Sequence, residues 1–317
     1  MTTDLAIGID IGATNFRVDV VHDDGTVATV AREATPVGDG DAVVDRVLAG
    51  IHAADRDYLP VGVGVAGIVD RSGRIVYGPN LGVGDLPLGG ILEARTARTV
   101  VVVNDAAAAA LAECRMGAAR GADDVVMVTI GTGVGGGLLV AGNIVQGTQG
   151  FAAELGHLRV PSSTRRCPCG ATGCVEAHAS GPAVLAQLEE RLDAGEASEL
   201  ADLPRVERDV AALVGAAARG DVLAREVVDD AGRALGAMLA EVVSALDPGA
   251  IVLGGGAGSL LASWFIPVVR DAIAAEAFAS GCRRLPEVRA AALGDRAGTV
   301  GAALLVHEHV RTLAAEA

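Results

Sequence analysis

The chain has 317 residues, which is long enough for two domains with a buried core, and its formal net charge is −15. Such an acidic balance argues against a nucleic-acid partner and against binding to an anionic membrane surface. All 25 basic residues are arginine. A Walker-type phosphate loop is therefore excluded, because its chemistry needs a lysine on the phosphates.

The opening MTTDLAIGID shows no charged leader, apolar core or cleavage site, so we expect an unsecreted, cytoplasmic protein. No apolar run reaches about 18 residues, and no membrane span is expected. Clustered cysteines without a signal segment fit a reducing compartment. Two cysteines lie outside the cluster, Cys114 and Cys282, and these are expected to be small apolar residues rather than reactive thiols.

The first third of the chain predicts a strand, a glycine turn and a second strand. The turn at 10–15 leads into another strand, whereas a dinucleotide-binding glycine loop must lead into a helix. A dinucleotide fold is therefore disfavoured. The expected elements are strands at 5–9, 16–21, 26–32, 61–65 and 99–103, a helix at 41–55 capped by Asp41, a loop at 77–81 and an alanine-rich helix ending at Met116.

The same unit recurs roughly 120 residues later, with a glycine turn at 131–137 between strands. A third glycine turn, at 254–258, follows a short apolar strand. This repetition predicts a duplicated α/β domain with a cleft between the halves. The other expected elements are strands at 125–130, 138–141, 251–253 and 288–293, and helices at 221–246, at 260–276 and from 297 onward.

The turns at 10–15 and 131–137 would place bare backbone amides around an anion, and each carries a threonine hydroxyl, at Thr14 and Thr132. Amide nests of this kind bind phosphates without a lysine. One such turn alone would be interpreted as a tight hairpin, but the recurrence favours a phosphate site. Asp10, just before the first turn, could hold Mg²⁺ through water.

Asp105 stands where a buried strand ends and a helix begins. One interpretation is a helix cap, since Asn104-Asp105 would cap well. The other is a general base that takes a proton from a substrate hydroxyl, as an aspartate does in kinase catalytic loops. Position alone does not separate the two, and the phosphate turns favour the base.

The segment 151–180 carries a predicted metal site. His157, Cys167, Cys169 and Cys174 lie within about twenty residues and match the ligands of tetrahedral zinc. Three thiolates and one imidazole close the coordination shell, so the zinc would be structural. A disulfide between Cys167 and Cys169 would close a strained ring, and an iron–sulfur cluster usually takes four thiolates.

Two carboxylates, Glu154 and Glu176, bracket the predicted metal site. A backbone pinned by metal would present them as fixed acceptors for a ligand rich in hydroxyls. They could equally be ordinary surface charges, and this stretch alone leaves both interpretations open.

These motifs together resemble the ROK family (repressors, open reading frames, sugar kinases), and the resemblance covers essentially the whole chain. The matching segments are Asp10-Ile-Gly-Ala-Thr14, Gly64-Val-Ala-Gly67, Asn104-Asp105-Ala-Ala, Gly131-Thr-Gly-Val-Gly-Gly-Gly137, Glu154-Leu-Gly-His157, Cys167-Pro-Cys-Gly-Ala-Thr-Gly-Cys174 and Val175-Glu176. The combination of Glu-x-x-His with Cys-x-Cys-Gly-x-x-Gly-Cys is highly specific.

The resemblance implies a fold of the sugar kinase/Hsc70/actin type, a duplicated actin-like ATPase fold with two domains around a cleft. We expect a small α/β domain at 1–117, a large one at 118–296 with a zinc loop at 157–174, and a closing helix at 297–317 that packs back on the first. The implied activity is that of an ATP:hexose 6-phosphotransferase similar to glucokinases, with ATP, Mg²⁺ and structural Zn²⁺. A homodimer or homotetramer is implied as well.

Site residues carry over position by position. The implied sugar-binding residues are Gly67, Asn80, Asn104, Asp105, Glu154, His157 and Glu176, with Asp105 as catalytic base. The implied nucleotide and cofactor contacts are Asp10, Gly12, Thr14, Asn15, Gly131, Thr132, Gly133, Gly255 and Gly256. The implied metal ligands are His157, Cys167, Cys169 and Cys174. His157 would bind metal through one nitrogen and face sugar with the other, so zinc loss is expected to raise the KM for sugar before ATP binding suffers.

Some positions depart from the family pattern. Ala13 and Asn15 replace a glycine and a lysine near the nucleotide phosphates, Ala107 replaces an asparagine after the base, and Ala66 replaces a proline. Alternative functions are a kinase for fructose, mannose, N-acetylglucosamine or N-acetylmannosamine, and a sugar-sensing ROK repressor. Repressors carry an additional N-terminal helix-turn-helix, whereas the first strand is expected by Leu5. The closed ligand set disfavours a zinc hydrolase.

Overall fold

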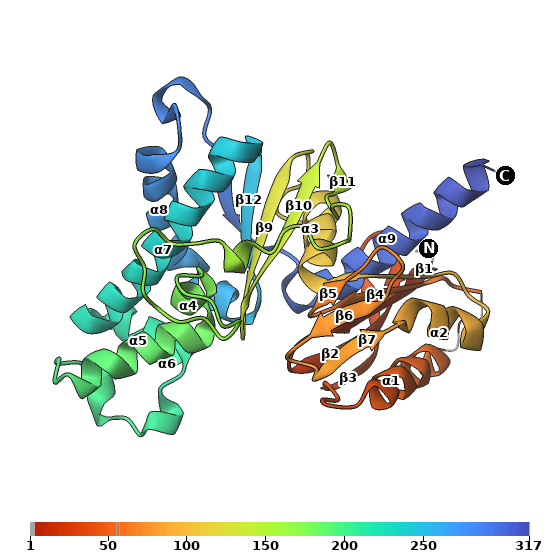
Figure 1. Cartoon of the computed structure of the whole chain (residues 1–317), viewed down its shortest axis with the longest axis horizontal. Helices are drawn as coiled ribbons and strands as arrows, with labels where there is room; N and C mark the ends of the chain where they lie inside the picture. Colours follow the sequence, from red (N-terminus) through yellow and green to blue (C-terminus); the bar gives the residue numbers. More distant parts are fainter. Residues whose placement is uncertain (1–3, 55, 57, 317) are drawn as a thin grey trace. The chain divides into compact units, whose positions relative to one another are not determined.

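The computed structural model describes residues 4–54, 56 and 58–316. The chain forms two compact units (Figure 1). Unit 1 comprises Met1–Asp123, Gly137–Ala153 and Asp295–Ala317, and unit 2 comprises Asp124–Gly136 and Glu154–Gly294. The expected boundary after residue 117 therefore differs in detail, because the segment 137–153 belongs to unit 1.

Unit 1 is built on a five-stranded sheet of order β3-β2-β1-β4-β8, accompanied by a small three-stranded sheet, β5-β6-β7. Its strands are β1 (Asp4–Ile11), β2 (Asn15–His22), β3 (Val27–Ala34), β4 (Val61–Val65), β5 (Ile68–Val69), β6 (Ile75–Gly78), β7 (Val83–Leu86), β8 (Val100–Asn104) and β11 (Asn143–Ile144). Its helices are α1 (Gly40–Ala53), α2 (Leu88–Thr96), α3 (Asp105–Met116) and α9 (Ala297–Glu316).

The strand directions in the large sheet of unit 1 follow from its connections. β1, β2 and β3 are antiparallel because short turns join them, while β4 and β8 run parallel to β1 after helical crossovers. All five residues of β4 are buried, as is usual for a central strand with parallel neighbours on both sides. The parallel strands β1, β4 and β8 therefore end at the same edge of the sheet.

The last helix, α9, packs on β1, β4 and α3 within unit 1 (Figure 1). Glycines make this close approach possible: a Cβ at Gly62 of β4 would overlap the carbonyl oxygen of Ala302. The buried carboxylate of Asp19 adds a polar tie, because it accepts hydrogen bonds of 2.6 Å from Thr299 Oγ1 and from Arg17 Nε. The C-terminal helix is therefore part of the core of the N-terminal unit.

Replacing Gly62 by alanine should destabilise the protein by at least about 3 kcal/mol, since the new methyl group meets backbone that cannot move aside. The matched control is Gly90→Ala in α2, where a Cβ meets nothing within 4 Å. That change should raise the free energy of unfolding by about 0.5–1 kcal/mol, because alanine is the better helix former. Urea denaturation of both variants tests the pair, and equal effects would contradict the packing.

Unit 2 contains most of a second five-stranded sheet, of order β11-β10-β9-β12-β13. The strands are β9 (Val125–Ile130), β10 (Val134–Val140), which runs on into unit 1, β12 (Ala250–Gly254) and β13 (Glu287–Ala290). The helices are α4 (Glu176–Ala179), α5 (Gly181–Asp193), α6 (Val210–Arg219), α7 (Val222–Leu246) and α8 (Gly256–Glu276). Short 3₁₀ turns lie at 155–157, 199–202, 205–207, 280–282 and 294–296.

The two large sheets share one strand order. When the five strands of each sheet are numbered by their order along the chain, their order across the sheet is third, second, first, fourth, fifth. In both, the last two strands run parallel to the first. The duplicated α/β organisation predicted from the recurring glycine turns is thereby confirmed.

Helices α7 and α8 pack against each other within unit 2. By length and composition α8 is the one candidate for a membrane span among the described residues. A buried core helix satisfies the same criterion, and Leu261, Phe265 and Val269 of α8 are fully buried.

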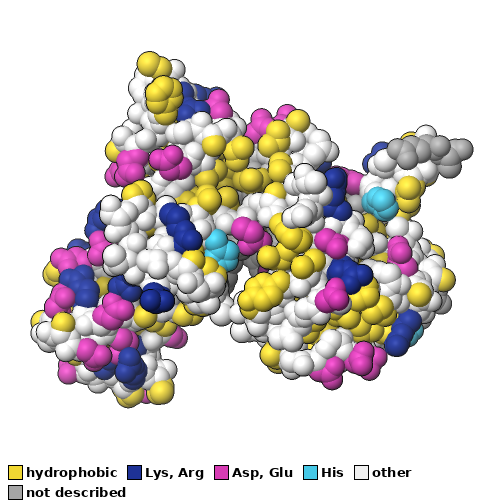
Figure 2. Space-filling view, viewed as in Figure 1, with side chains coloured by type: hydrophobic (Ala, Val, Ile, Leu, Met, Phe, Trp, Pro, Cys, Tyr) yellow, Lys and Arg dark blue, Asp and Glu magenta, His cyan; other side chains and the backbone are white. Residues whose placement is uncertain are grey.

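Acidic and basic side chains intermix over the region of α5 and α6 (Figure 2), as in the pairs Arg208–Glu189 and Arg165–Glu190. The Arg165–Glu190 pair is partly exposed to solvent, and ion pairs of this kind add little stability.

Several boundaries differ from the sequence predictions. The cap of α1 is Asp39, whose carboxylate accepts from the amide of Asp41 at 2.9 Å, and not Asp41. The predicted end of this helix, residue 55, lies outside the described residues. Tyr77 and Gly78 belong to β6 instead of a loop, and α8 begins at Gly256, so the third glycine turn is a strand-to-helix junction. The helices α2, α4, α5 and α6 were not predicted.

Candidate active site and metal centre

In unit 1, Asp10 and Asp105 gather at the common edge where the parallel strands end. Asp10 pairs in register with Gly64 of β4, and Val65 of β4 pairs with Asn104 of β8. A Cβ on Gly64 would lie 3.4 Å from Cα of Asp105. The backbone of β4 at Gly64 therefore packs closely against the start of α3, the helix that carries Asp105.

Asn104, and not Asp105, is the N-cap of α3. Its Oδ1 accepts from the amide of Ala107 at 3.1 Å, and its Nδ2 donates to the carbonyl of Gly67 at 3.1 Å. Asp105 is the first helical residue, and its Oδ1 accepts from the amide of Ala106 at 2.8 Å. The N-cap position therefore belongs to Asn104, and Gly67 and Asn104, both predicted as sugar-binding residues, are in direct contact.

The environment of Asp105 suits a proton acceptor. Burial raises the pKa of the Asp105 carboxyl above its ordinary value, and the hydrogen bond from the amide of Ala106 opposes that rise. A carboxylate whose pKa lies closer to neutrality is a stronger base than an exposed one. The position at the first turn of α3 also stabilises the negative form.

Asp10 is a second perturbed carboxyl in unit 1. Its Oδ1 is buried and has no hydrogen-bond partner in the part of the chain that the structure describes. A Cβ on Gly298 of α9 would overlap the other oxygen. Burial, and next the charge of Asp105, raise the pKa of Asp10 to about 8, while Arg17 acts in the opposite direction. A bare buried oxygen of this kind fits a cation or its hydration water.

The raised pKa of Asp10 makes the magnesium-free protein pH-sensitive. Because the folded-state pKa exceeds the unfolded value, this group favours folding below about pH 4, and that contribution is lost as pH rises to about 8. Relative to Asp10→Asn, the wild type should lose up to about 1.4 kcal/mol of unfolding free energy per pH unit in this window. Urea titrations at pH 5, 6.5 and 8 measure the difference. The exposed Asp24 serves as control, since a hydrogen bond from the Thr26 hydroxyl lowers its pKa. Parallel curves for wild type and Asp10→Asn would contradict the prediction.

The first glycine turn joins β1 to β2. The amide of Gly12 donates to the carbonyl of Asn15 at 2.9 Å, and the hydroxyl of Thr35 donates to the carbonyl of Gly12 at 2.7 Å. Asn15 lies where the family pattern has a lysine, and its Nδ2 donates to Thr14 Oγ1 at 3.0 Å. The turn thus presents neutral groups in place of a cation.

In unit 2, the second and third glycine segments lie against each other. Gly255 has φ +86°, and a Cβ there would come within 2.5 Å of the carbonyl oxygen of Ile130, the residue before Gly131. Only glycine fits this position. Gly256 begins α8, so helix amides stand beside the turn Gly131-Thr132-Gly133. A helix N-terminus next to a glycine turn is a ready site for phosphate.

The four predicted metal ligands converge. Their ligand atoms, from His157, Cys167, Cys169 and Cys174, all lie within 4.8 Å of one another. Cys169 Sγ is 3.7 Å from Cys174 Sγ, and Cys167 Sγ is 3.9 Å from His157 Nδ1. With Zn–S bonds of about 2.3 Å, a tetrahedral site places its ligands about 3.8 Å apart. Glycines of positive φ at 170 and 173 allow the turns. The donor set and its spacing fit zinc.

Two further contacts hold the metal loop and were missed from the sequence. Arg159 Nη1 lies 3.3 Å from Cys174 Sγ, and Ser163 Oγ is 2.7 Å from His178 Nε2 of α4. Burial, followed by the charge of Arg165, lowers the pKa of His178, so its ring is neutral near pH 7. No sequence spacing marks these pairs, because they arise from the fold of the loop.

The remaining sugar-site candidates are distributed over the two units. Asn80 is exposed in the turn after β6 of unit 1, and Glu154 is exposed at the start of the second segment of unit 2. Glu176 begins α4, and its Oε2 accepts from the amide of Val134 at 3.0 Å. Gly67, Asn104 and Asp105 belong to unit 1, and Glu154, His157 and Glu176 to unit 2.

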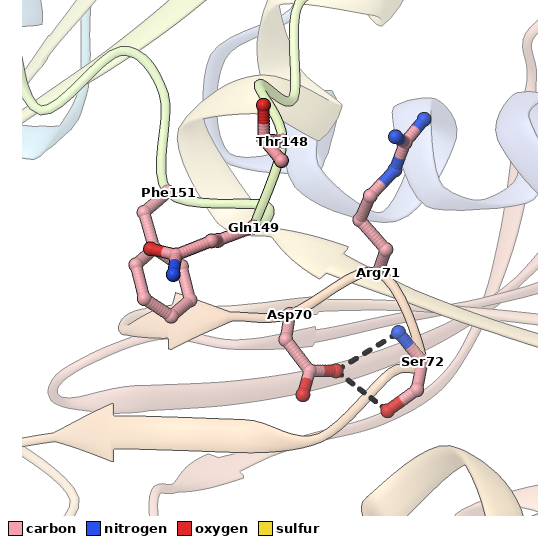
Figure 3. Close-up of a pocket in the computed structure, with 6 residues that line it drawn as sticks. All are labelled: Asp70, Arg71, Ser72, Thr148, Gln149 and Phe151. Atoms are coloured by element: carbon pink, nitrogen blue, oxygen red, sulfur yellow. Dashed lines mark hydrogen bonds between the residues drawn. The ribbon is translucent and has the colours of Figure 1, made fainter.

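A separate pocket of about 360 Å³ lies within unit 1 (Figure 3). The hairpin turn between β5 and β6 faces the loop after β11, and the Asp70 carboxylate accepts from both the amide and the hydroxyl of Ser72. Its lining residues are Asp70, Arg71, Ser72, Thr148, Gln149 and Phe151. None of the predicted site residues lines it, so we assign it no part in the active site.

Comparison with known proteins places these features in one family. The family model described as "ROK family" matches residues 6–309. The glucokinase of Streptomyces coelicolor is 34% identical over 96% of this chain and 98% of its own length. A solved ROK family glucokinase from Streptomyces griseus, in complex with glucose and AMPPNP, is 35% identical with a TM-score of 0.83, over 96% of this chain and 99% of that one. A solved ROK family transcriptional regulator, a homologue of the E. coli MLC protein, is 29% identical with a TM-score of 0.85, over 96% of this chain and 77% of its own.

The paired sheets and the glycine turns define a protein of the actin-like ATPase fold, the class that includes sugar kinases, as the sequence predicted. Within that class the chain belongs to the ROK family.

Proposed function

We propose that this protein is an ATP-dependent glucokinase that converts ATP and D-glucose to ADP and D-glucose 6-phosphate. The observation that carries the proposal is the state of Asp105: a half-buried carboxylate at a strand-to-helix junction, which is not the N-cap of α3 and whose pKa is raised by desolvation. The similarity to glucokinases over nearly the whole chain supports the same activity.

Asp105 acts as general base in this proposal. It accepts the proton of the sugar 6-hydroxyl while the hydroxyl oxygen attacks the γ-phosphorus of ATP in line. The bond from the γ-phosphorus to the bridging oxygen breaks, and ADP leaves with that oxygen. The amide of Ala106 holds one carboxylate oxygen of Asp105 in place, which fixes the direction of the other.

Among the residues proposed to bind the sugar, Asn104 already carries fixed contacts. Asn104 is held at both ends of its amide, by Ala107 and by Gly67. Glu154, His157 and Glu176 would accept or donate to the other sugar hydroxyls, with Asn80 contributing from its turn. Side chains whose rotamers are locked before binding lose little entropy on contact with the ligand.

Nucleotide binding uses the glycine segments. Amides of the turns at Gly12–Asn15 and Gly131–Gly133, together with the start of α8 at Gly255 and Gly256, would surround the phosphates. Asp10 would hold Mg²⁺ through water, because its buried Oδ1 has no hydrogen-bond partner among the described residues. The ion supplies positive charge beside the phosphates when bound.

The His157–Cys167–Cys169–Cys174 cluster would hold a structural zinc ion that orders the loop carrying His157. We also propose a cytoplasmic homodimer or homotetramer. Metal analysis and light scattering of protein purified under reducing conditions test these parts of the proposal.

The test of function is an ADP-release assay on glucose, fructose, mannose, N-acetylglucosamine and N-acetylmannosamine. The highest kcat/KM should be for glucose. A higher kcat/KM for another hexose would support the same phosphoryl transfer with a different preferred substrate. Absence of turnover with every sugar, together with sugar-dependent binding to a specific DNA sequence, would replace the enzyme with a ROK regulator.

A further inference from the structure

The carboxylate of Glu176 lies between two sites of unit 2. On one side, Oε1 is 3.4 Å from Sγ of Cys167, a residue of the metal cluster. On the other, Oε2 accepts from the amide of Val134 at 3.0 Å. Val134 directly follows the turn Gly131-Thr132-Gly133 and begins β10. One side chain thus contacts both a metal ligand and the second glycine turn.

The turn Gly131-Thr132-Gly133 packs directly against this carboxylate. A Cβ on Gly133 would lie 2.5 Å from Glu176 Oε2 and 3.4 Å from its Cδ. Apart from the adjacent residues Thr132 and Val134, no other heavy atom of the described residues lies within 4 Å of that position. The amide of Gly181 donates to the carbonyl of Gly131 at 2.9 Å, so the segment after α4 holds the turn from a second direction. The turn and the metal segment form one packed cluster.

The backbone of Glu176 is tied to the metal ligands. Val175, the preceding residue, donates its amide to the carbonyl of Leu158, which follows His157, at 2.9 Å. The amide of Ala177 donates to the carbonyl of Cys174 at 3.0 Å. A metal that fixes His157 and Cys174 therefore also fixes the start of α4 and the direction of the Glu176 side chain.

We propose that Glu176 is a positioning residue that transmits occupancy of the His157–Cys167–Cys169–Cys174 cluster to the Gly131–Gly133 turn, and through it to nucleotide binding. The nucleotide part rests on the proposed kinase function. Loss of metal would then weaken sugar and nucleotide binding together, in contrast to the expectation from sequence that sugar binding suffers first.

A double-mutant cycle on AMPPNP affinity tests the coupling. Gly133→Ala should raise the dissociation constant about tenfold, because its methyl group displaces the charged acceptor of the Val134 amide. Glu176→Ala alone should have a similar effect. In the Glu176→Ala background, Gly133→Ala should change the dissociation constant less than about twofold, since the methyl group then enters free space.

The matched control is Gly131→Ala in the same turn, where a Cβ meets nothing within 4 Å. Its effect on the dissociation constant should be the same with Glu176 and with Ala at position 176. A direct clash between a new methyl group and the nucleotide would likewise act equally in both backgrounds. Full additivity of Gly133→Ala and Glu176→Ala would therefore overturn the proposal.

Amide hydrogen exchange provides a readout that does not depend on the kinase function. Removal of zinc with a chelator should accelerate exchange at Val134 at least about tenfold. The amide of Gly12 in the first glycine turn, which belongs to unit 1, should keep its rate. Unchanged exchange at Val134 after metal removal would refute the coupling. Absence of AMPPNP binding in the wild type would refute the proposed function alone, and the exchange rates would still decide the coupling.

Discussion

Replacing Asp105 by alanine is expected to lower kcat for glucose about 10³-fold while the KM values change little. The loss follows from removal of the base, since general-base catalysis contributes roughly 10²–10⁴-fold. Asp105→Asn should be equally inactive. The asparagine side chain keeps the shape of aspartate and can still accept the hydrogen bond from the amide of Ala106, but it cannot accept the proton of the sugar hydroxyl. Coupled ADP-release kinetics measure both variants.

A matched control for Asp105 is another aspartate at a helix start. Asp209 caps α6, with its carboxylate accepting from the amide of Ala212 at 2.8 Å, and it is exposed in unit 2. Asp209→Ala should lower stability by about 1 kcal/mol and leave kcat unchanged. Full activity of Asp105→Ala would remove the base assignment. The pH profile gives a further check: kcat/KM of the wild type should fall as the solution is acidified through the raised pKa of Asp105, because the protonated form cannot accept a proton.

Replacing Cys174 by alanine is expected to abolish stoichiometric zinc and to raise the KM for glucose at least about tenfold. Cys174 is fully buried within the cluster, so its loss opens the coordination shell from inside. Structural zinc contributes its binding free energy to folding, on the order of 10 kcal/mol in isolated zinc modules. Metal analysis, glucose kinetics and thermal unfolding of the purified variant measure the three consequences.

The control for Cys174→Ala is Cys282→Ala, an exposed cysteine outside the cluster. It should keep one zinc per chain, the wild-type KM and the wild-type melting temperature. The Cys174 variant should melt at least about 5 °C lower, given a loss of about 2 kcal/mol or more. A Cys174→Ala protein that retains zinc or binds glucose normally would contradict the structural role.

The sequence was most informative where chemistry and local spacing coincide. The recurring glycine turns predicted the doubled sheet, since each one ends a buried strand that the fold repeats. The cysteine and histidine spacing predicted the cluster that the structure brings together. Both predictions depend on residues that are close in sequence, and the spacing of such residues can be read directly from the chain.

Some features of the structure were not predicted because they depend on contacts between residues far apart in the sequence. Glu176 and Val134 are 42 residues apart, and a backbone amide gives no sequence signal for its acceptor. The small sheet β5-β6-β7 escaped notice because its strands are two to four residues long, too short for a periodicity. Asp105 was ambiguous because a cap and a base share one sequence pattern. The hydrogen bonds of Asn104 identify Asn104 as the cap, and the role of Asp105 as base stays a prediction.

The packing of α9 on β1 and β4 has a consequence for synthesis of the chain. The glycine-lined face of unit 1 has its partner helix only when residues 297–316 have emerged from the ribosome, after every residue of unit 2. Unit 2 can therefore fold during translation, whereas unit 1, although it contains the first residues made, is completed last. The carboxyl group of Asp10, which lies against Gly298, takes its final environment only at that moment.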